Sequence, residues 1–174
     1  ITGTSGQGKS MIANKILKSE LASDTKGVIL DLGNSFYKTS KYFNGEILSR
    51  KFNPLQFKNA TYLKEFILSV IDDKLSKKEE GRLFTAIQDI LEYIPNNFSD
   101  FLSKLEQNFE GISFYFSEIL PFFTDEEIKL NNLTYCDFSN YPEAMKAPLI
   151  IYLIEYFKNL DGKKIFIFDE CWHL

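Results

Sequence analysis

Apolar and polar positions along the chain follow two patterns, one typical of helices and one typical of buried strands. Apolar residues recur at helical spacing between about Lys9 and about Ser23, which predicts a helix there. Three short apolar runs between turn residues predict strands. GVILDLG at 27–33 and LTYCDF at 133–138 are expected to be buried, and IFIFDE at 165–170 is expected to form the third strand.

Two short segments follow the first predicted strand. The sequence SFYKTSKYFNG predicts a short helix that Gly45 closes. The sequence RKFNPL predicts a brief extended segment, because Pro54 disfavours the helical conformation at Asn53.

The middle of the chain, from about residue 60 to about residue 130, is predicted to be mainly helical. Both LKEFILSVI and GRLFTAIQDILEYI place their apolar residues on one face, and Pro95 stops the second helix. Ser99 is predicted to cap a further short helix. We interpret the aromatic-rich segment 109–123 as core beneath these helices, with a subunit interface as the alternative.

A last helix is predicted over residues 141–160, and the turn DGKK leads from it into the third strand. Strands that alternate with helices favour parallel pairing. The expected fold class is therefore α/β, with a layered arrangement of helices on a parallel sheet.

Composition and charge restrict the classes of function. The net charge is −4, from 20 basic and 24 acidic residues, which argues against a nucleic-acid footprint over the whole surface. Cys136 and Cys171 are too few for a disulfide framework and are expected to be reduced and buried. The apolar stretch 145–157 is too short to span a bilayer and contains Glu155.

The stretch GTSGQGKS near the start of the chain fits the phosphate-binding pattern G-x-x-x-x-G-K-[ST]. Its glycines allow the backbone to turn tightly and approach an anion, and the helix that follows favours negative charge at its start. Lys9 would reach the β- and γ-phosphates of ATP, and the Ser10 hydroxyl would ligate Mg²⁺. The residues expected to bind the nucleotide are Gly3, Thr4, Ser5, Gly6, Gln7, Gly8, Lys9 and Ser10.

Two carboxylates at the end of IFIFDE complete the predicted site. In P-loop proteins a strand of this kind carries an Asp that supports Mg²⁺, and Asp169 fits that role. Glu170, on the other side of the strand end, is expected to act as a catalytic general base toward water. Because ligands bind beyond the carboxyl ends of parallel strands, the loop and this pair can meet at one Mg²⁺–nucleotide complex.

The pieces GTSGQGKS, VILDLGNSF, FNPL, LTYCDFSN and IFIFDECWHL occur in this order. In them the chain resembles the large VirB/TraC-type ATPases of conjugative and type IV secretion systems, within the HerA/FtsK-like group of RecA-fold motors. After the DE pair this family usually has Ala-Trp, a basic residue and leucines, so Trp172 and Leu174 fit and Cys171 departs. We interpret Trp172 as a packing anchor and His173 as a surface or packing residue.

This resemblance implies a RecA-like P-loop NTPase core with an all-helical insertion. The expected division is 1–57 for the first part of the core, 58–132 for the insertion, and 133–174 for the remainder through the Walker B strand. We expect a fragment truncated at both ends. A strand before the loop would need about five residues, and only Ile1 and Thr2 precede Gly3. Asp31 either corresponds to a family position near the nucleotide-binding edge or caps the next turn.

The resemblance also implies a function: ATP hydrolysis with Mg²⁺ that drives pilus assembly or substrate transfer. Family members work as hexamers at the cytoplasmic base of the secretion channel, peripheral to the inner membrane and beside other channel proteins. One alternative is a DNA-translocating ATPase of the HerA/FtsK type, although DNA binding is not indicated here. The other is an assembly module that binds nucleotide without turnover. The isolated chain is expected to hydrolyse ATP poorly or not at all.

Overall fold

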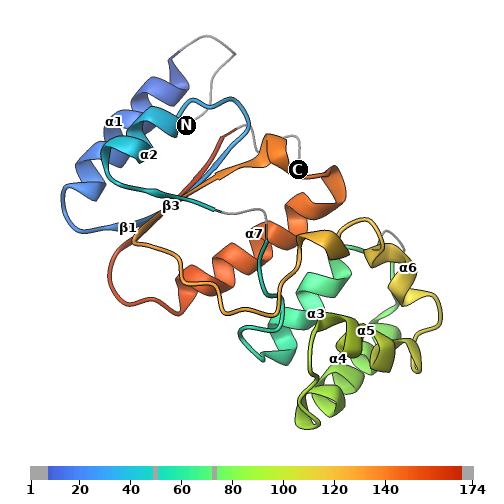
Figure 1. Cartoon of the computed structure of the whole chain (residues 1–174). Helices are drawn as coiled ribbons and strands as arrows, with labels where there is room; N and C mark the ends of the chain where they lie inside the picture. Colours follow the sequence, from blue (N-terminus) through green and yellow to red (C-terminus); the bar gives the residue numbers. More distant parts are fainter. Residues whose placement is uncertain (1–7, 49–50, 72–73, 170–174) are drawn as a thin grey trace. The chain divides into compact units, whose positions relative to one another are not determined.

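The computed structural model describes residues 8–48, 51–71 and 74–169 (Figure 1). The chain divides into two compact units. The first unit comprises Ile1–Ser49, Lys129–Tyr141 and Phe157–Leu174, and the second comprises Arg50–Ile128 and Pro142–Tyr156. The expected three-part division of the chain stays a prediction.

The first unit is built on a four-stranded sheet in which every neighbouring pair of strands is parallel. Its strands are β1 (Lys26–Asp31), β2 (Glu46–Ile47), β3 (Leu133–Asp137) and β4 (Lys164–Phe168), in the order β2-β3-β1-β4. The 3-10 turn η2 (Phe138–Asn140) follows β3. The predicted α/β fold with parallel strands is confirmed. The sequence did not predict β2, which has only two residues.

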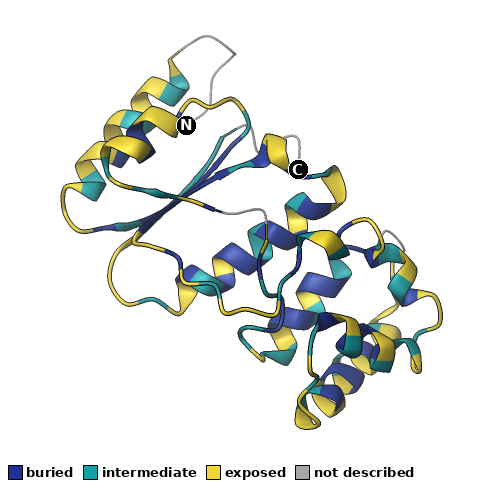
Figure 2. Ribbon diagram, viewed as in Figure 1, coloured by how far each residue is buried: buried dark blue, intermediate teal, exposed yellow. Residues whose placement is uncertain are grey.

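One face of this sheet is covered by α1 (Lys9–Leu21) and by the segment that leads into α2 (Tyr37–Tyr42). In register across the strands, Ile29 lies opposite Tyr135 on β3 and Ile167 on β4. These side chains form one cluster with Leu17 of α1 and Phe36. Figure 2 shows the result: β1 is buried, whereas α1 and α2 expose their outer faces. Burial on both sides explains why β1 has a continuous apolar sequence.

The second unit is helical and has an aromatic core. Its helices are α3 (Ala60–Leu68), α4 (Lys77–Glu92), α5 (Phe98–Glu106), α6 (Ile112–Phe116), the 3-10 turn η1 (Leu120–Phe122) and most of α7 (Glu143–Lys158). The ring centroids of Phe98 and Phe123 are 4.8 Å apart, and those of Phe52 and Tyr152 are 4.5 Å apart. The core interpretation of segment 109–123 is confirmed for Ile112, Phe116, Ile119 and Phe123, which are buried, whereas Phe114 is exposed.

One helix cap in the second unit differs from the prediction. Ser76 caps α4 in a capping box with Glu79, whose backbone N–H donates to the Ser76 hydroxyl. The prediction that Ser99 caps the next helix is wrong, because α5 begins at Phe98 and Ser99 lies inside its first turn. Asn97 is the cap: its backbone is extended, and its side chain accepts a 2.8 Å hydrogen bond from the backbone N–H of Asp100.

Candidate functional site

The start of α1 carries the last three residues of the predicted phosphate loop. Gly8 is the N-cap residue, with φ +73° and ψ 16°, a left-handed conformation that favours glycine. Its carbonyl oxygen accepts a 3.0 Å hydrogen bond from the backbone N–H of Ile12. Lys9 and Ser10 are the first helical residues, and no side chain of the described residues caps this end. The helix dipole and the first-turn N–H groups therefore favour an anion here.

Asp169 directly follows β4. Its backbone N–H donates a 2.8 Å hydrogen bond to the carbonyl oxygen of Leu30, so the ends of β4 and β1 lie side by side. α1 precedes β1 and connects to its amino end, so the start of α1 faces the carboxyl ends of the strands. The structure thus brings Gly8, Lys9, Ser10 and Asp169 to the same edge of one sheet. Their roles in nucleotide and metal binding stay predictions.

The turn after β1 is held by Asp31, which is fully buried. One carboxylate oxygen accepts a 3.0 Å hydrogen bond from the N–H of Gly33, and the other accepts 2.9 Å from the N–H of Phe36. These bonds end β1 at Asp31, two residues before the predicted end. The prediction that Asp31 caps the next turn is confirmed.

Tyr135 on β3 strengthens the same turn. Its hydroxyl lies 3.1 Å from the Asp31 carboxylate and 3.0 Å from Oδ1 of Asn34, and it donates its single proton to this pair of acceptors. Burial and the neighbouring Asp31 carboxylate raise the pKa of the Tyr135 hydroxyl, so the hydroxyl stays a donor near neutral pH. Asn34 itself has φ +57°, which asparagine tolerates better than most residues.

Asn14, in the second turn of α1, connects this helix to the segment after β1. Its Nδ2 donates 2.9 Å to the carbonyl oxygen of Ser10 and 3.1 Å to that of Ser35. Its Oδ1 accepts a 2.5 Å hydrogen bond from the Thr39 hydroxyl. The sequence reasoning identified neither Asn14 nor Tyr135, because their partners lie far away in the chain and belong to no local motif.

The donor groups at this edge fit Mg²⁺ better than a softer metal. Ser10 and Asp169 offer a hydroxyl and a carboxylate, which are hard oxygen ligands. Within residues 8–48, 51–71 and 74–169, no group of three or more His, Cys, Asp and Glu side chains could hold a metal ion. This set suits Mg²⁺, which usually takes one or two protein ligands and completes its shell with phosphates and water.

Several predicted residues lie outside the described part of the chain. These are Gly3, Thr4, Ser5, Gly6, Gln7, Glu170, Cys171, Trp172, His173 and Leu174. Cys136 is described: its thiol is free and buried, as expected, and burial raises its pKa. It is therefore a packing residue and not a thiolate nucleophile.

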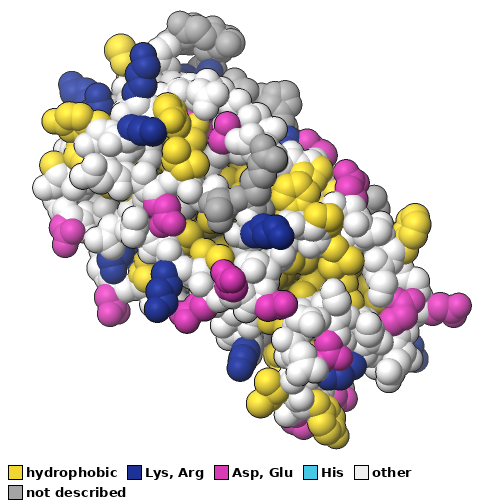
Figure 3. Space-filling view, viewed as in Figure 1, with side chains coloured by type: hydrophobic (Ala, Val, Ile, Leu, Met, Phe, Trp, Pro, Cys, Tyr) yellow, Lys and Arg dark blue, Asp and Glu magenta, His cyan; other side chains and the backbone are white. Residues whose placement is uncertain are grey.

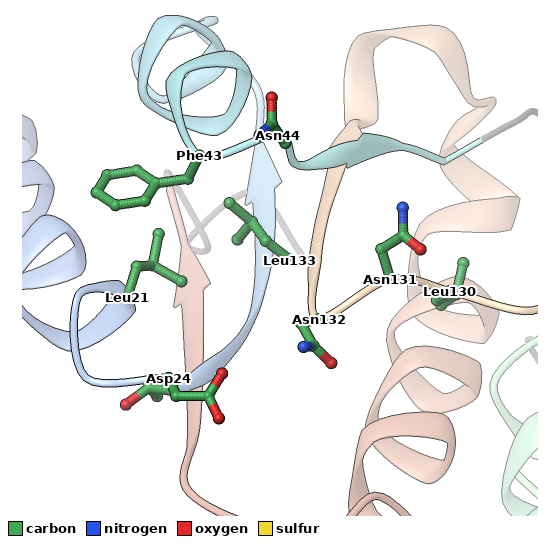
Figure 4. A pocket seen from close by; sticks show the side chains of 9 residues that line it. Leu21, Asp24, Phe43, Asn44, Leu130, Asn131, Asn132 and Leu133 are labelled. Carbon is green, nitrogen blue, oxygen red and sulfur yellow. The ribbon is translucent and has the colours of Figure 1, made fainter.

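A cavity of about 410 Å³ lies at the opposite edge of the sheet (Figure 4). Asp24 and Asn132 line it where β1 and β3 begin, with Leu21, Phe43 and Leu133 beside them. Of the predicted site residues that the structure describes, Gly8, Lys9, Ser10 and Asp169, none lines it. Because ligands of parallel α/β sheets bind beyond the carboxyl ends of the strands, this cavity is not the expected nucleotide site.

The surface carries mixed charges. Figure 3 shows Lys and Arg side chains among Asp and Glu side chains on the face in view, without a broad basic patch. Among the described helices, none is long and apolar enough to cross a membrane.

Comparisons with known proteins agree with this geometry. The family described as the TraG P-loop domain matches residues 1–141. The solved structure of VirB4 of Thermoanaerobacter pseudethanolicus is similar at a TM-score of 0.66 and 16% sequence identity. The similarity covers 98% of this chain and 59% of that one, and at this identity it shows a shared fold. The search of curated proteins gives no match. Because the family match spans most of the 174 residues, the chain belongs to the TraG P-loop domain family.

Proposed function

We propose that this chain is the nucleotide-binding part of an ATP-hydrolysing motor that energises type IV secretion or conjugative pilus assembly. The observation that carries the proposal is that the end of the phosphate-loop motif and the end of the IFIFDE strand lie at one sheet edge. Lys9 and Ser10, which end the phosphate-loop motif, begin α1 there. Asp169, at the end of the strand, is held beside β1 by its backbone hydrogen bond to Leu30. Membership of the TraG P-loop domain family and the VirB4-like fold support the same function.

Each residue has a distinct role in this proposal. The backbone of residues 3–10 cradles the phosphates, and the Lys9 ammonium binds the β- and γ-phosphates. The Ser10 hydroxyl and the Asp169 carboxylate hold Mg²⁺, and the Glu170 carboxylate orients and polarises the attacking water. Bound Mg²⁺ would offset the negative charge of the phosphates.

The proposal extends to the assembled protein. The full-length protein would act as a homo-hexamer on the cytoplasmic side of the inner membrane, peripheral to it and in contact with other proteins of the secretion channel. The helical residues 58–132 would form an insertion into the nucleotide-binding core. This chain spans 59% of the VirB4 chain that it resembles, so the proposed motor would include parts beyond these residues.

The test is steady-state ATP hydrolysis by the full-length protein with Lys9→Ala and Glu170→Gln. Lys9→Ala is expected to abolish binding and turnover, whereas Glu170→Gln is expected to bind ATP and not hydrolyse it. Undiminished hydrolysis by both variants would refute the proposal. Turnover that rises on addition of duplex DNA would favour a DNA-translocating motor, and binding without turnover in the wild type would favour an assembly module.

A further inference from the structure

The position of Asn14 links two segments that meet at the proposed site. One nitrogen atom, its Nδ2, donates to the carbonyl oxygens of both Ser10 and Ser35, so these oxygens lie within two hydrogen-bond lengths of each other. Ser10 belongs to the first turn of α1, and Ser35 belongs to the turn after β1. The turn after β1 is thereby fixed beside the residue proposed to ligate Mg²⁺.

The hydrogen-bonding chemistry leaves a single orientation for the Asn14 amide. A backbone carbonyl oxygen can only accept, so the side of the amide that faces Ser10 and Ser35 must be the NH₂ group. Oδ1 then faces Thr39, whose hydroxyl donates to it. Thr39 is 7% exposed, so this donor stays largely shielded from water and keeps the amide in place.

The turn after β1 is also attached to the sheet by hydrogen bonds. Asp31 binds the N–H groups of Gly33 and Phe36, and Tyr135 binds Asp31. The turn therefore has a fixed attachment to the sheet, and Asn14 is its hydrogen-bonded attachment to α1. A change at Asn14 removes these hydrogen bonds and leaves intact both the connection to the sheet and the packing of Phe36 against Leu17.

We propose that Asn14 is a positioning residue of the nucleotide site: it holds the turn after β1 against the first turn of α1 and so fixes the backbone of Ser10. This inference rests on the proposed function, because it assigns Ser10 to Mg²⁺. Asn14 acts through Ser10. Its loss lets the Ser10 backbone shift and weakens the contribution of Mg²⁺ to ATP binding and turnover.

The test uses Asn14→Leu in the full-length protein, because leucine has nearly the shape of asparagine and makes no hydrogen bond. ATP affinity is measured in EDTA and in Mg²⁺, together with kcat, KM and the melting temperature. The gain in affinity on adding Mg²⁺, and kcat, are expected to fall about 10–100-fold, as for groups that orient metal ligands. The affinity in EDTA is expected to stay near the wild-type value. The melting temperature is expected to fall modestly, because the buried Thr39 hydroxyl loses its acceptor.

Thr39→Val is the second variant, since it removes only the hydroxyl that orients the amide, and it is expected to show a smaller change in the same direction. Ser19→Ala, an exposed residue of the same helix, is the control. A lower melting temperature with an unchanged Mg²⁺ response in both variants would show that Asn14 is only structural and overturn the inference. Lys9→Ala is measured in parallel: if it abolishes turnover while both variants respond normally to Mg²⁺, this inference alone fails.

Discussion

The backbone N–H of Asp169 donates a 2.8 Å hydrogen bond to the carbonyl oxygen of Leu30. This bond continues the parallel pairing of β4 with β1 by one residue beyond Phe168. The bond therefore fixes the backbone of Asp169 at the sheet edge where α1 begins. The Asp169 carboxylate is attached to this fixed backbone. The carboxylate itself can be changed without loss of this bond, because the bond is made by the backbone.

The first prediction is that Asp169→Asn impairs the metal dependence of the full-length protein and spares its fold. The amide keeps the size of the side chain and removes its charge. Mg²⁺-dependent ATP turnover is expected to fall about 10–100-fold, as for a weakened metal site, and ATP affinity in EDTA is expected to stay unchanged. Asp161→Asn, in the exposed turn before β4, is the control. Equal turnover in both variants would rule out a metal role for Asp169.

The second prediction concerns the coupling of Asp31 and Tyr135. Asp31→Ala leaves the buried N–H of Phe36 without its acceptor and is expected to lower the free energy of unfolding by about 1–3 kcal/mol, whereas Tyr135→Phe costs about 1 kcal/mol. Both substitutions remove the same hydrogen bond, so the double variant should lose less than the sum. Denaturant unfolding measures all three, and Tyr42→Phe, at an 80% exposed tyrosine, is the neutral control.

Additive losses in this cycle would contradict the shared hydrogen bond between Asp31 and Tyr135. A cost for Tyr42→Phe equal to that for Tyr135→Phe would also contradict it, because the first hydroxyl lies on an exposed residue.

The main elements of the fold were predictable from the sequence. β1 and β3 are continuous apolar runs between turn residues, and burial on both faces of a parallel sheet requires this pattern. β4 has a similar apolar run, although it lies at the edge of the sheet and is only partly buried. β2 was not predictable, because two residues carry no periodicity and their pairing with β3 depends on tertiary structure. The cap of α5 was misplaced because Asn97 and Ser99 are both good cap residues, and only the position of the buried Phe98 distinguishes them.

The candidate site was predictable only where a motif covers it. Gly8, Lys9, Ser10 and Asp169 belong to short patterns whose chemistry requires those residue types. The supporting hydrogen bonds join residues far apart in the chain: 25 positions separate Asn14 from Thr39 and 104 separate Asp31 from Tyr135. Such pairs exist only after the sheet has formed, so no local pattern predicts them.

The third prediction concerns pH and the loop before α6. Hydrogen bonds from Ser113, through its side chain and its backbone N–H, and from the N–H of Gly111 lower the pKa of Glu106 from its ordinary 4.5. Because this pKa is lower in the folded state, the stabilisation is complete above about pH 4.5 and is lost as pH falls through the folded value. Glu106→Gln should therefore be less stable than wild type at pH 7, and the difference should shrink below pH 4.5.

Urea unfolding of the chain at a series of pH values measures this difference. Glu118→Gln, at an exposed residue of the same region, should show a difference that is small at every pH. A difference between Glu106→Gln and wild type that stays constant from pH 7 to the acid limit would contradict the role of the carboxylate.

The last prediction concerns the close approach of Gly45 to Ser40. A Cβ atom on Gly45 would collide with the Ser40 hydroxyl oxygen and would lie 3.0 Å from the Leu133 side chain, and both neighbours are buried. Gly45→Ala is therefore expected to destabilise the chain by about 1–3 kcal/mol through overpacking. Within the described residues the buried Ser40 hydroxyl has no hydrogen-bond partner, so Ser40→Ala alone should be neutral or stabilising.

Combining Ser40→Ala with Gly45→Ala removes the shorter of the two contacts, and the double variant should recover most of the stability lost in Gly45→Ala. Gly81→Ala is the matched control, because Gly81 lies inside α4 and a methyl group there would meet no atom of the described residues within 4 Å. Alanine at this position should stabilise the helix by about 1 kcal/mol. Thermal and denaturant unfolding measure all four variants. If Gly45→Ala and the double variant are equally unstable, the contact with Leu133 and not the one with Ser40 excludes a side chain at position 45.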